Sequence, residues 1–479
     1  WKRQMNETNE TYRLYFHLMP PAGWLNDPNG LCQYQGNYHV FFQYAPESSL
    51  GGRKFWGHYV SPDLIRWKFL GTALCPDTKW DRDGVYSGSA FTEDGFLELF
   101  YTGNVKEKGD FDYISAGRGA NVLYTKSSSG ETFKEKNLLL SNEDYPASYT
   151  CHVRDPKVWK ENGQYYMILG GRRKNDQGAV MIYSSPDKKT WSLCREMSTR
   201  EPFGYMWECP DLFEMAGTRF LLCCPQGLEA QQERYQNLYQ SGYFVCDDFT
   251  LEDQKDYVCI PADFRELDYG FDFYAPQTFT DQKGRRILIG WAGMSEETDY
   301  GSEPTVREGW QHSLTVPRQL SWSDGVLHQY PVSELEQLRC RKLSLDSDFI
   351  EAPAFDLCLT FGGSDQSVRF NDDLILTCRE GLVTLTFLNG TGCGRTSRCA
   401  RLKQPDGHME NLRILKDTSL LEIYINDGEL VFTTKYFPKN TNRTAVTVTG
   451  TVLDAQFWEL RRMEVETDEN EKKYSAGNR

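Results

Sequence analysis

Hydrophobic and polar positions alternate along most of the first two thirds of the chain, with the period of two that is typical of β-strands. One pattern recurs: a turn that contains glycine is followed by a short run of aromatic and aliphatic residues. The runs occupy residues 38–44, 96–102, 165–171, 219–225 and 286–292, and their first residues are 58, 69, 54 and 67 positions apart. Units of about 60 residues have room for four short strands with long loops. The pattern therefore predicts an all-β fold that begins with a five-bladed β-propeller.

A second repeated motif supports this spacing. Ser-Pro-Asp at residues 61–63 is followed by Trp67, and Ser-Pro-Asp at residues 185–187 is followed by Trp191, 124 positions later. That separation corresponds to two of the predicted units. Two copies of one turn at one place in the repeat favour a propeller built from similar blades.

The pattern changes after residue 330. A short helical segment is predicted there, because Leu335 and Leu338 are spaced for one apolar stripe. Further short strands follow, and turns such as Asn-Asp-Gly at residues 426–428 separate them. We therefore predict a catalytic propeller at residues 1–330, a helical linker at 331–342, and a C-terminal β-sandwich at 343–479 whose charged tail is frayed.

Composition excludes several classes of partner. The net charge is −15 and the pI about 5.1, so a nucleic-acid backbone would be repelled. No run of 18 apolar residues is present, which excludes a membrane-spanning helix. Residues 1–10 lack the apolar stretch of a secretory signal, and the 14 cysteines are scattered without Cys-x-x-Cys pairs or metal spacing. We expect a cytoplasmic protein with free thiols rather than a secreted one, and the sequence favours no oligomeric state.

Polar residues recur at nearly one phase of the repeat. Asp27, Asp155 and Glu208 lie 11, 10 and 11 residues before their runs, while Ser87 and Asp272 lie 9 and 14 before theirs. The first strands of all blades converge on the axis of a propeller, so these side chains are expected to face one funnel. Converging carboxylates without metal ligands favour glycosidic bond cleavage, by a retaining or an inverting route according to their separation. The alternative is a set of solvated loop carboxylates and Asx turns.

These residues lie in motifs that resemble the ordered motif set of glycoside hydrolase family 32, which contains invertases, sucrose-6-phosphate hydrolases and fructanases. The motifs are Trp-Leu-Asn-Asp-Pro-Asn-Gly at 24–30, Phe-Gln-Tyr at 42–44, Trp-Gly-His at 56–58, Tyr-Ser-Gly-Ser at 86–89, Arg-Asp-Pro at 154–156, Glu-Cys-Pro-Asp at 208–211, Asp-Phe-Tyr-Ala-Pro-Gln at 272–277 and Gly-Trp at 290–291. The resemblance spans about residues 13–330. It implies a five-bladed propeller followed by a β-sandwich, and retaining attack at C2 of a terminal β-fructofuranosyl unit. It implies no cofactor and no metal.

The resemblance also implies roles for single residues. Asp27 is the expected nucleophile, Glu208 the general acid and base, and Asp155 the stabiliser of the transition state. The residues expected to bind the fructosyl unit are Asn26, Gln43, Trp56, Tyr86, Ser87, Arg154, Asp272 and Trp291.

One segment departs from the family pattern. Between Pro46 and Trp56 many relatives carry a further Trp-Gly, whereas residues 47–55 read Glu-Ser-Ser-Leu-Gly-Gly-Arg-Lys-Phe. An aromatic platform at the rim of the pocket is therefore missing or replaced. Lys54, Arg172 and Arg173 are candidate contacts for a phosphate on the leaving group, and the alternative is that they are solvated loop charges.

Together these features predict a retaining β-fructofuranosidase that acts on a small-molecule sugar, sucrose or sucrose 6-phosphate. Two alternatives stay open. The first is an exo-acting hydrolase of fructans or fructo-oligosaccharides, and the second is an inactive propeller that only binds carbohydrate. An assay for released fructose separates the inactive propeller from the enzymes.

Overall fold

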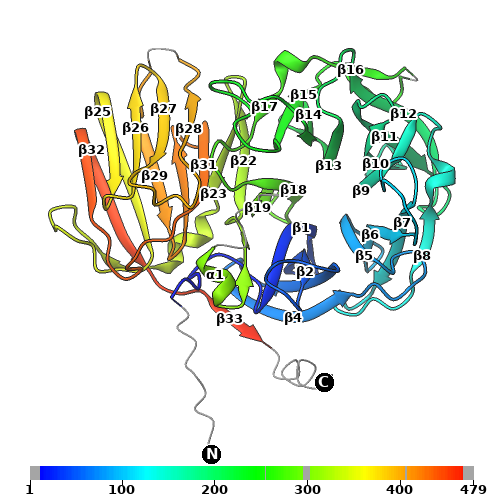
Figure 1. Cartoon of the computed structure of the whole chain (residues 1–479), viewed down its shortest axis with the longest axis horizontal. Helices are drawn as coiled ribbons and strands as arrows, with labels where there is room; N and C mark the ends of the chain where they lie inside the picture. The colour runs from blue at the N-terminus through cyan, green and yellow to red at the C-terminus, as the bar shows by residue number, and fades with distance from the viewer. Residues whose placement is uncertain (1–10, 254, 295–302, 405–406, 468–479) are drawn as a thin grey trace, which may run out of the picture.

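The structure is a computed structural model that describes residues 11–253, 255–294, 303–404 and 407–467. It is an all-β fold with a propeller-like arrangement of sheets and a sandwich- or barrel-like C-terminal part (Figure 1). Residues 1–10, which lack a signal-like stretch, lie outside the described residues. The tail predicted to fray covers residues 466–479; its first two residues end a β-strand, against that expectation, and residues 468–479 lie outside the described residues. Within the described ranges, no helix is long and apolar enough to cross a membrane.

The propeller-like part is made of separate antiparallel sheets. The first contains β1 (Gly23–Tyr34), β2 (Asn37–Ala45), β3 (Phe55–Ser61) and β4 (Arg66–Leu74). The second contains β5 (Gly84–Glu93), β6 (Phe96–Lys106), β7 (Arg118–Ser127) and β8 (Asn137–Leu140). The third contains β9 (Tyr149–Glu161), β10 (Gln164–Arg173), β11 (Gly178–Ser185) and β12 (Ser192–Thr199), extended by a parallel strand, β16 (Tyr257–Cys259).

Two more sheets complete this part. One contains β13 (Met206–Met215), β14 (Thr218–Gln226), β15 (Gly242–Val245) and β17 (Arg265–Glu266). The other contains β18 (Tyr274–Thr280), β19 (Arg286–Ala292), β22 (Arg318–Ser323), β23 (Val326–Pro331) and the short β21 (Ser313–Leu314). The short helices η1 (Asn142–Asp144), η2 (Pro261–Asp263) and α1 (Pro304–Arg307) are single turns in the connections.

The five recurrent runs fall in the second strand of each sheet, namely β2, β6, β10, β14 and β19. Each first strand, β1, β5, β9, β13 or β18, packs against the first strands of the neighbouring sheets, and β18 packs against β1. The ring of sheets is therefore closed. The predicted all-β fold with a propeller-like arrangement of sheets is confirmed.

The repeated Ser-Pro-Asp motif has the same structure in both copies. The Ser61 and Ser185 hydroxyls accept the backbone N–H of Asp63 and Asp187, at 3.1 and 3.2 Å. The indole of the Trp four residues after each Asp donates to a backbone carbonyl within the turn, at 3.1 Å in both copies. The motif thus marks one kind of turn in two sheets.

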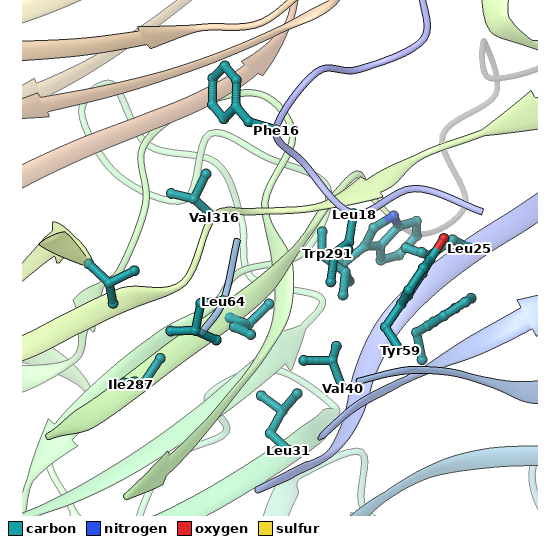
Figure 2. Close-up of a cluster of buried hydrophobic side chains, with 14 of the residues drawn as sticks. Phe16, Leu18, Leu25, Leu31, Val40, Tyr59, Leu64, Ile287, Trp291 and Val316 are labelled. Atoms are coloured by element: carbon teal, nitrogen blue, oxygen red, sulfur yellow. The ribbon is translucent and has the colours of Figure 1, made fainter. Parts of the chain in front are cut away.

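The first and last sheets are joined by hydrogen bonds and by a shared core. β20 (Trp310–Gln311) follows the last sheet's first hairpin and pairs in parallel with β1 at Gly23 and Trp24. Figure 2 shows the buried cluster beside it, in which Leu25 and Val40 of the first sheet lie near Ile287 and Trp291 of the last. Burial of such side chains contributes about 1.5–3 kcal/mol each, so this contact holds the ring closed.

The C-terminal part is built on two long strands. Along one edge β25 pairs with β32 from end to end, and along the other edge it pairs with β29 at residues 355–360 and with β26 at residues 366–370. The strands are β24 (Arg339–Lys342), β25 (Phe355–Phe370), β26 (Leu374–Arg379), β27 (Leu382–Phe387), β28 (Ser397–Arg401), β29 (Asn411–Lys416), β30 (Leu420–Ile425), β31 (Leu430–Lys435) and β32 (Val446–Leu460). A separate apolar cluster fills this part, with Phe355, Leu376 and Ile423 fully buried.

The two parts are linked by more than one segment. The predicted helical segment is a 3₁₀ helix, η4 (Ser333–Leu338), with Leu335 and Leu338 buried as expected. The last residues of the predicted linker form β24 and pair with β32. β33 (Glu464–Thr467) returns to the first sheet and pairs in parallel with β4. The domain boundaries at residues 330 and 343 stay a prediction.

Candidate active site

The first strand of each sheet in the ring has a β-bulge at the same place. The strand register shifts between Leu25 and Pro28 in β1, Tyr86 and Gly88 in β5, Arg154 and Lys157 in β9, Glu208 and Asp211 in β13, and Tyr274 and Gln277 in β18. A bulge leaves a residue out of the ladder and redirects its side chain. The polar residues recur in the sequence because the same backbone irregularity recurs in each first strand.

Three bulge residues have left-handed backbones. The φ angles of Asp155, Cys209 and Ala275 are +65°, +48° and +48°. This conformation is uncommon for residues other than glycine, although Asp adopts it more readily than most. Such strain is tolerated where the surrounding structure holds it in place, and here it places side chains at the centre of the ring.

A cavity of about 510 Å³ opens at this centre. That volume lies within the range of small-molecule sites. Most of the residues that the sequence singled out line it: Asn26, Asp27, Gln43, Lys54, Tyr86, Arg154, Asp155, Arg172, Glu208 and Trp291. The convergence of distant segments that the repeat predicted is therefore present, while the role of each side chain stays a prediction.

A ring of hydrogen bonds fixes the Asp27 carboxylate. Asn26 Nδ2 donates to Asp27 Oδ1 at 3.0 Å and to Gln43 Oε1 at 2.8 Å. Gln43 Nε2 donates to Ser87 Oγ at 2.6 Å, and Ser87 Oγ donates to Asp27 Oδ2 at 2.5 Å. Trp24 Nε1 holds Asn26 from the other side at 2.9 Å. Both carboxylate oxygens are therefore oriented before any ligand arrives.

Burial raises the pKa of Asp27, against the hydrogen bonds from Ser87 and Asn26, which lower it, and the charge of Glu208 adds to the rise. The Cys209 thiol connects this residue to the next acid. Its Sγ lies 3.8 Å from Asp27 Oδ2 and 3.6 Å from Asp155 Oδ2. The two carboxylates thus flank one buried thiol.

Asp155 is nearly completely buried. Its Oδ2 accepts the backbone N–H of Cys209 at 2.8 Å, and its own N–H donates to Thr102 Oγ1 at 2.9 Å. Burial raises the pKa of Asp155 to about 7, the guanidinium of Arg154 lowers it, and the charges of Glu208 and Asp27 raise it further. The folded protein therefore carries this ionised carboxylate at a cost.

Asp155→Asn should make the protein more stable at pH 8 than the wild type, by about 1–4 kcal/mol. The pKa is about 7 in the folded state and about 3.9 in an unfolded chain, so the cost is fully present above pH 7 and absent below about pH 4. Asn keeps an oxygen for the Cys209 N–H. Unfolding curves of both proteins at pH 8 and pH 4 test this, and an equal difference at the two pH values would contradict it.

Glu208 is held at both oxygens. Arg154 donates to Oε1 through Nε at 2.9 Å and Nη2 at 2.8 Å. Gln226 Nε2 and the Tyr274 hydroxyl each donate to Oε2 at 2.6 Å. The side chain is 15% exposed, and it is thereby oriented toward the same cavity as Asp27.

Four of the predicted contact residues do not line the cavity. Trp56 is fully buried behind the site, where its Nε1 donates to the Tyr86 carbonyl at 3.0 Å. Ser87 is also fully buried and acts on Asp27 instead of on a ligand. These two expectations are corrected: both residues support the side chains that line the cavity.

Asp272 and Arg173 need a similar correction. Asp272 precedes β18, outside the bulge, and its carboxylate pairs with Arg395 of the C-terminal part at 2.8 Å. Arg173 follows Arg172 on β10, so it points to the opposite face of the strand and pairs with Glu196. Neither contacts the cavity.

Lys54 and Arg172, the other two candidate contacts for a leaving-group phosphate, line the cavity. Lys54 Nζ stands 4.9 Å from the centre of the Trp24 ring, and burial lowers the pKa of Lys54 to about 8 against the charge of Asp27. Arg172 lies over the Tyr205 ring at 4.5 Å and pairs with the exposed Asp176 at 2.7 Å. Arg172 is therefore already neutralised, whereas Lys54 faces the acid cluster.

Sequence reasoning missed several residues of the site, chiefly Tyr274, Gln226, Arg118 and Lys106. The sequence could have indicated Tyr274, because it lies 12 residues before the run 286–292. That position is closer than Asp272 to the phase of the other polar residues. Gln226 and the two cations occupy ends of second and third strands, for which the repeat carried no pattern.

Three carboxylates, Asp155 buried and Asp27 and Glu208 partly buried, are fixed by hydrogen bonds in one cavity at the centre of a ring of sheets. Paired carboxylates in a cavity are the catalytic groups of glycoside hydrolases. The comparisons agree. Residues 17–331 match the "Glycosyl hydrolases family 32 N-terminal domain", and residues 386–459 match "Glycosyl hydrolases family 32 C terminal". The chain belongs to glycosyl hydrolase family 32.

Its relatives match over nearly their whole lengths. The chain is 38% identical over 456 residues to the sucrose-6-phosphate hydrolase of Bacillus subtilis (strain 168), with 91% of each chain covered. The sucrose-6-phosphate hydrolase of Lactobacillus gasseri has a similar structure, with a TM-score of 0.84, 30% identity, and 95% and 94% of the two chains covered. A Bombyx mori β-fructofuranosidase mutant in complex with sucrose superposes with a TM-score of 0.81 at 31% identity, with 95% of each chain covered.

Proposed function

We propose that this enzyme is a retaining β-fructofuranosidase that hydrolyses sucrose or sucrose 6-phosphate through a covalent fructosyl-enzyme intermediate. The observation that carries the proposal is the pairing of Asp27 and Glu208 in one cavity, each with both oxygens oriented by the protein. The substrates named for the relatives support the choice of sugar.

In this proposal the Asp27 carboxylate attacks C2 of the fructosyl unit. Glu208 gives a proton to the oxygen of the departing group and then takes a proton from the water that releases fructose. Asp155, held beside Asp27 by Cys209, accepts hydrogen bonds from the sugar that strengthen as positive charge develops on the ring. Asn26, Gln43, Tyr86 and Trp291 form the walls around the fructosyl unit, with Lys54 at its rim.

The proposal extends to architecture and setting. We take the five sheets around the cavity as five propeller blades, which the closed ring of first strands supports. The predicted division into propeller, linker and β-sandwich is retained, and the partner is a small-molecule sugar. A cytoplasmic location remains part of the proposal, and buried free thiols such as Cys223 and Cys224 fit a reducing compartment.

The purified protein is expected to release fructose from sucrose or its 6-phosphate with retention at C2, so that NMR detects the β-anomer before mutarotation. Inulin and short fructo-oligosaccharides serve as the comparison. Faster release of fructose from inulin or the oligosaccharides than from sucrose and its 6-phosphate would indicate a fructan hydrolase instead. No release of fructose from any of these sugars would indicate a protein that only binds carbohydrate.

A further inference from the structure

One wall of the cavity carries two cations directly opposite each other. Lys106 is the last residue of β6 and Arg118 the first of β7, and they are partners in the antiparallel register. Side chains of such a pair lie on the same face of the sheet, and like charges in this position destabilise it. Both line the cavity.

Neither cation has an acidic partner among the described residues. The hydrogen bond of Arg118 runs from Nε to the Tyr113 carbonyl at 3.0 Å, and Lys106 Nζ lies 5.5 Å from the centre of the Tyr113 ring. The nearby Asp112 carboxylate instead accepts the backbone N–H groups of Ile114, Ser115 and Ala116. The two positive charges therefore face the cavity uncompensated.

The surroundings of Arg118 add to this imbalance. Burial, followed by the charge of Arg154, lowers the pKa of Arg118. The cation is thus held where its charge is unfavourable, in contrast to Arg154 and Arg172, which pair with Glu208 and Asp176. A bound anion would remove the penalty.

This wall lies on the side of the proton donor. The charges of Arg154 and Glu208 both affect the pKa of Arg118, whereas the charge of Asp27 affects the pKa of Lys54 across the cavity. His152 lies in the same wall, with its Nε2 3.1 Å from the Tyr113 carbonyl. Burial and the charges of Arg154 and Arg118 lower the pKa of His152 to about 3, so its ring is neutral there. The departing group of the substrate occupies the side of Glu208, because Glu208 protonates it.

We propose that Arg118, with Lys106 beside it, binds a phosphate group on the departing sugar and so selects sucrose 6-phosphate over sucrose. The inference rests on the proposed function and deepens it. Nε of Arg118 is held by Tyr113, which leaves the two terminal nitrogens of the guanidinium for phosphate oxygens. Arg173 carries an equal charge, but it is paired with Glu196 away from the cavity and takes no part.

Arg118→Gln should lower kcat/KM for sucrose 6-phosphate by about ten- to a hundredfold, mainly through KM, and change that for sucrose less than about twofold. Lys106→Gln, at an exposed position that does not endanger folding, should have a smaller effect of the same sign. Arg118→Lys should retain part of the preference for sucrose 6-phosphate, because it keeps the positive charge and loses the planar pair of guanidinium donors. Arg173→Gln is the matched control and should change neither sugar.

Calorimetry supplies a readout without turnover. Glucose 6-phosphate should bind the wild type more tightly than glucose, and Arg118→Gln should remove most of the difference. An equal loss on both sugars in Arg118→Gln and Lys106→Gln, or a wild-type preference for sucrose, would overturn the phosphate site. If the wild type releases fructose in the same assay, the proposed function holds whether or not the phosphate site does. If it releases none, the proposed function itself is contradicted.

Discussion

Asp27→Ala should lower kcat for sucrose by about four to six orders of magnitude, because the variant has no carboxylate to attack C2. Its thermal unfolding should stay close to that of the wild type. The pKa of Asp27 is raised by burial, so the ionised carboxylate is itself carried at a cost in the folded state. Initial rates of fructose release and unfolding curves measure the two effects.

Asp27→Asn is the matched variant. It keeps an oxygen and so preserves the hydrogen bond from the Ser87 hydroxyl or the Asn26 amide, while it removes the nucleophile. Both variants should fail to give a fructosyl adduct in mass spectra of the acid-quenched protein. Activity within tenfold of the wild type in a folded variant would mean that another residue attacks the sugar.

Glu208→Ala should slow the hydrolysis of sucrose by about a hundred- to ten-thousandfold, the usual contribution of general acid–base catalysis. A fructoside with a good leaving group needs little protonation, so its cleavage should be slowed much less. Added azide should speed turnover of this activated substrate and give fructosyl azide, since azide attacks the intermediate without needing a base.

Glu208→Gln separates catalysis from positioning in this experiment. Its amide keeps an oxygen for the Arg154 guanidinium but cannot transfer a proton, so it should behave like the alanine variant. Equal losses on sucrose and the activated fructoside, with no azide product, would assign the proton transfers to a different group.

Much of the architecture could be predicted because strand patterns are local. The second strand of every sheet was visible as a run of alternating apolar residues, and the glycine turns before the runs marked the hairpins. The repeat then predicted a common place for Asp27, Asp155 and Glu208. Its physical basis is the bulge in each first strand, where Pro28, Pro156 and Pro210 follow the acids within two residues and break the ladder.

The errors lie where a side chain's direction depends on packing. Trp56 stands in a matching motif, yet the face of β3 that carries it is packed against Phe41 and Tyr101, so it supports the site from behind. Arg172 and Arg173 are neighbours in the sequence but lie on opposite faces of β10. Strand alternation guarantees that only one of them can reach the cavity, but it does not say which one.

The sequence by itself determined the strand repeat, the rigid turns and the kind of residue at each bulge, because each depends on neighbours within a few positions. The tertiary structure alone decided which of these residues meet. It brought Tyr274 and Gln226 into hydrogen bonds with Glu208, paired Asp272 with Arg395, and set Lys106 opposite Arg118. The closed ring of sheets brings Tyr274 to Glu208, and the C-terminal part supplies Arg395 to Asp272, so these two contacts join segments far apart in the chain. The register between neighbouring strands sets the other two, because Gln226 and Glu208 lie on β14 and β13, and Lys106 and Arg118 on β6 and β7.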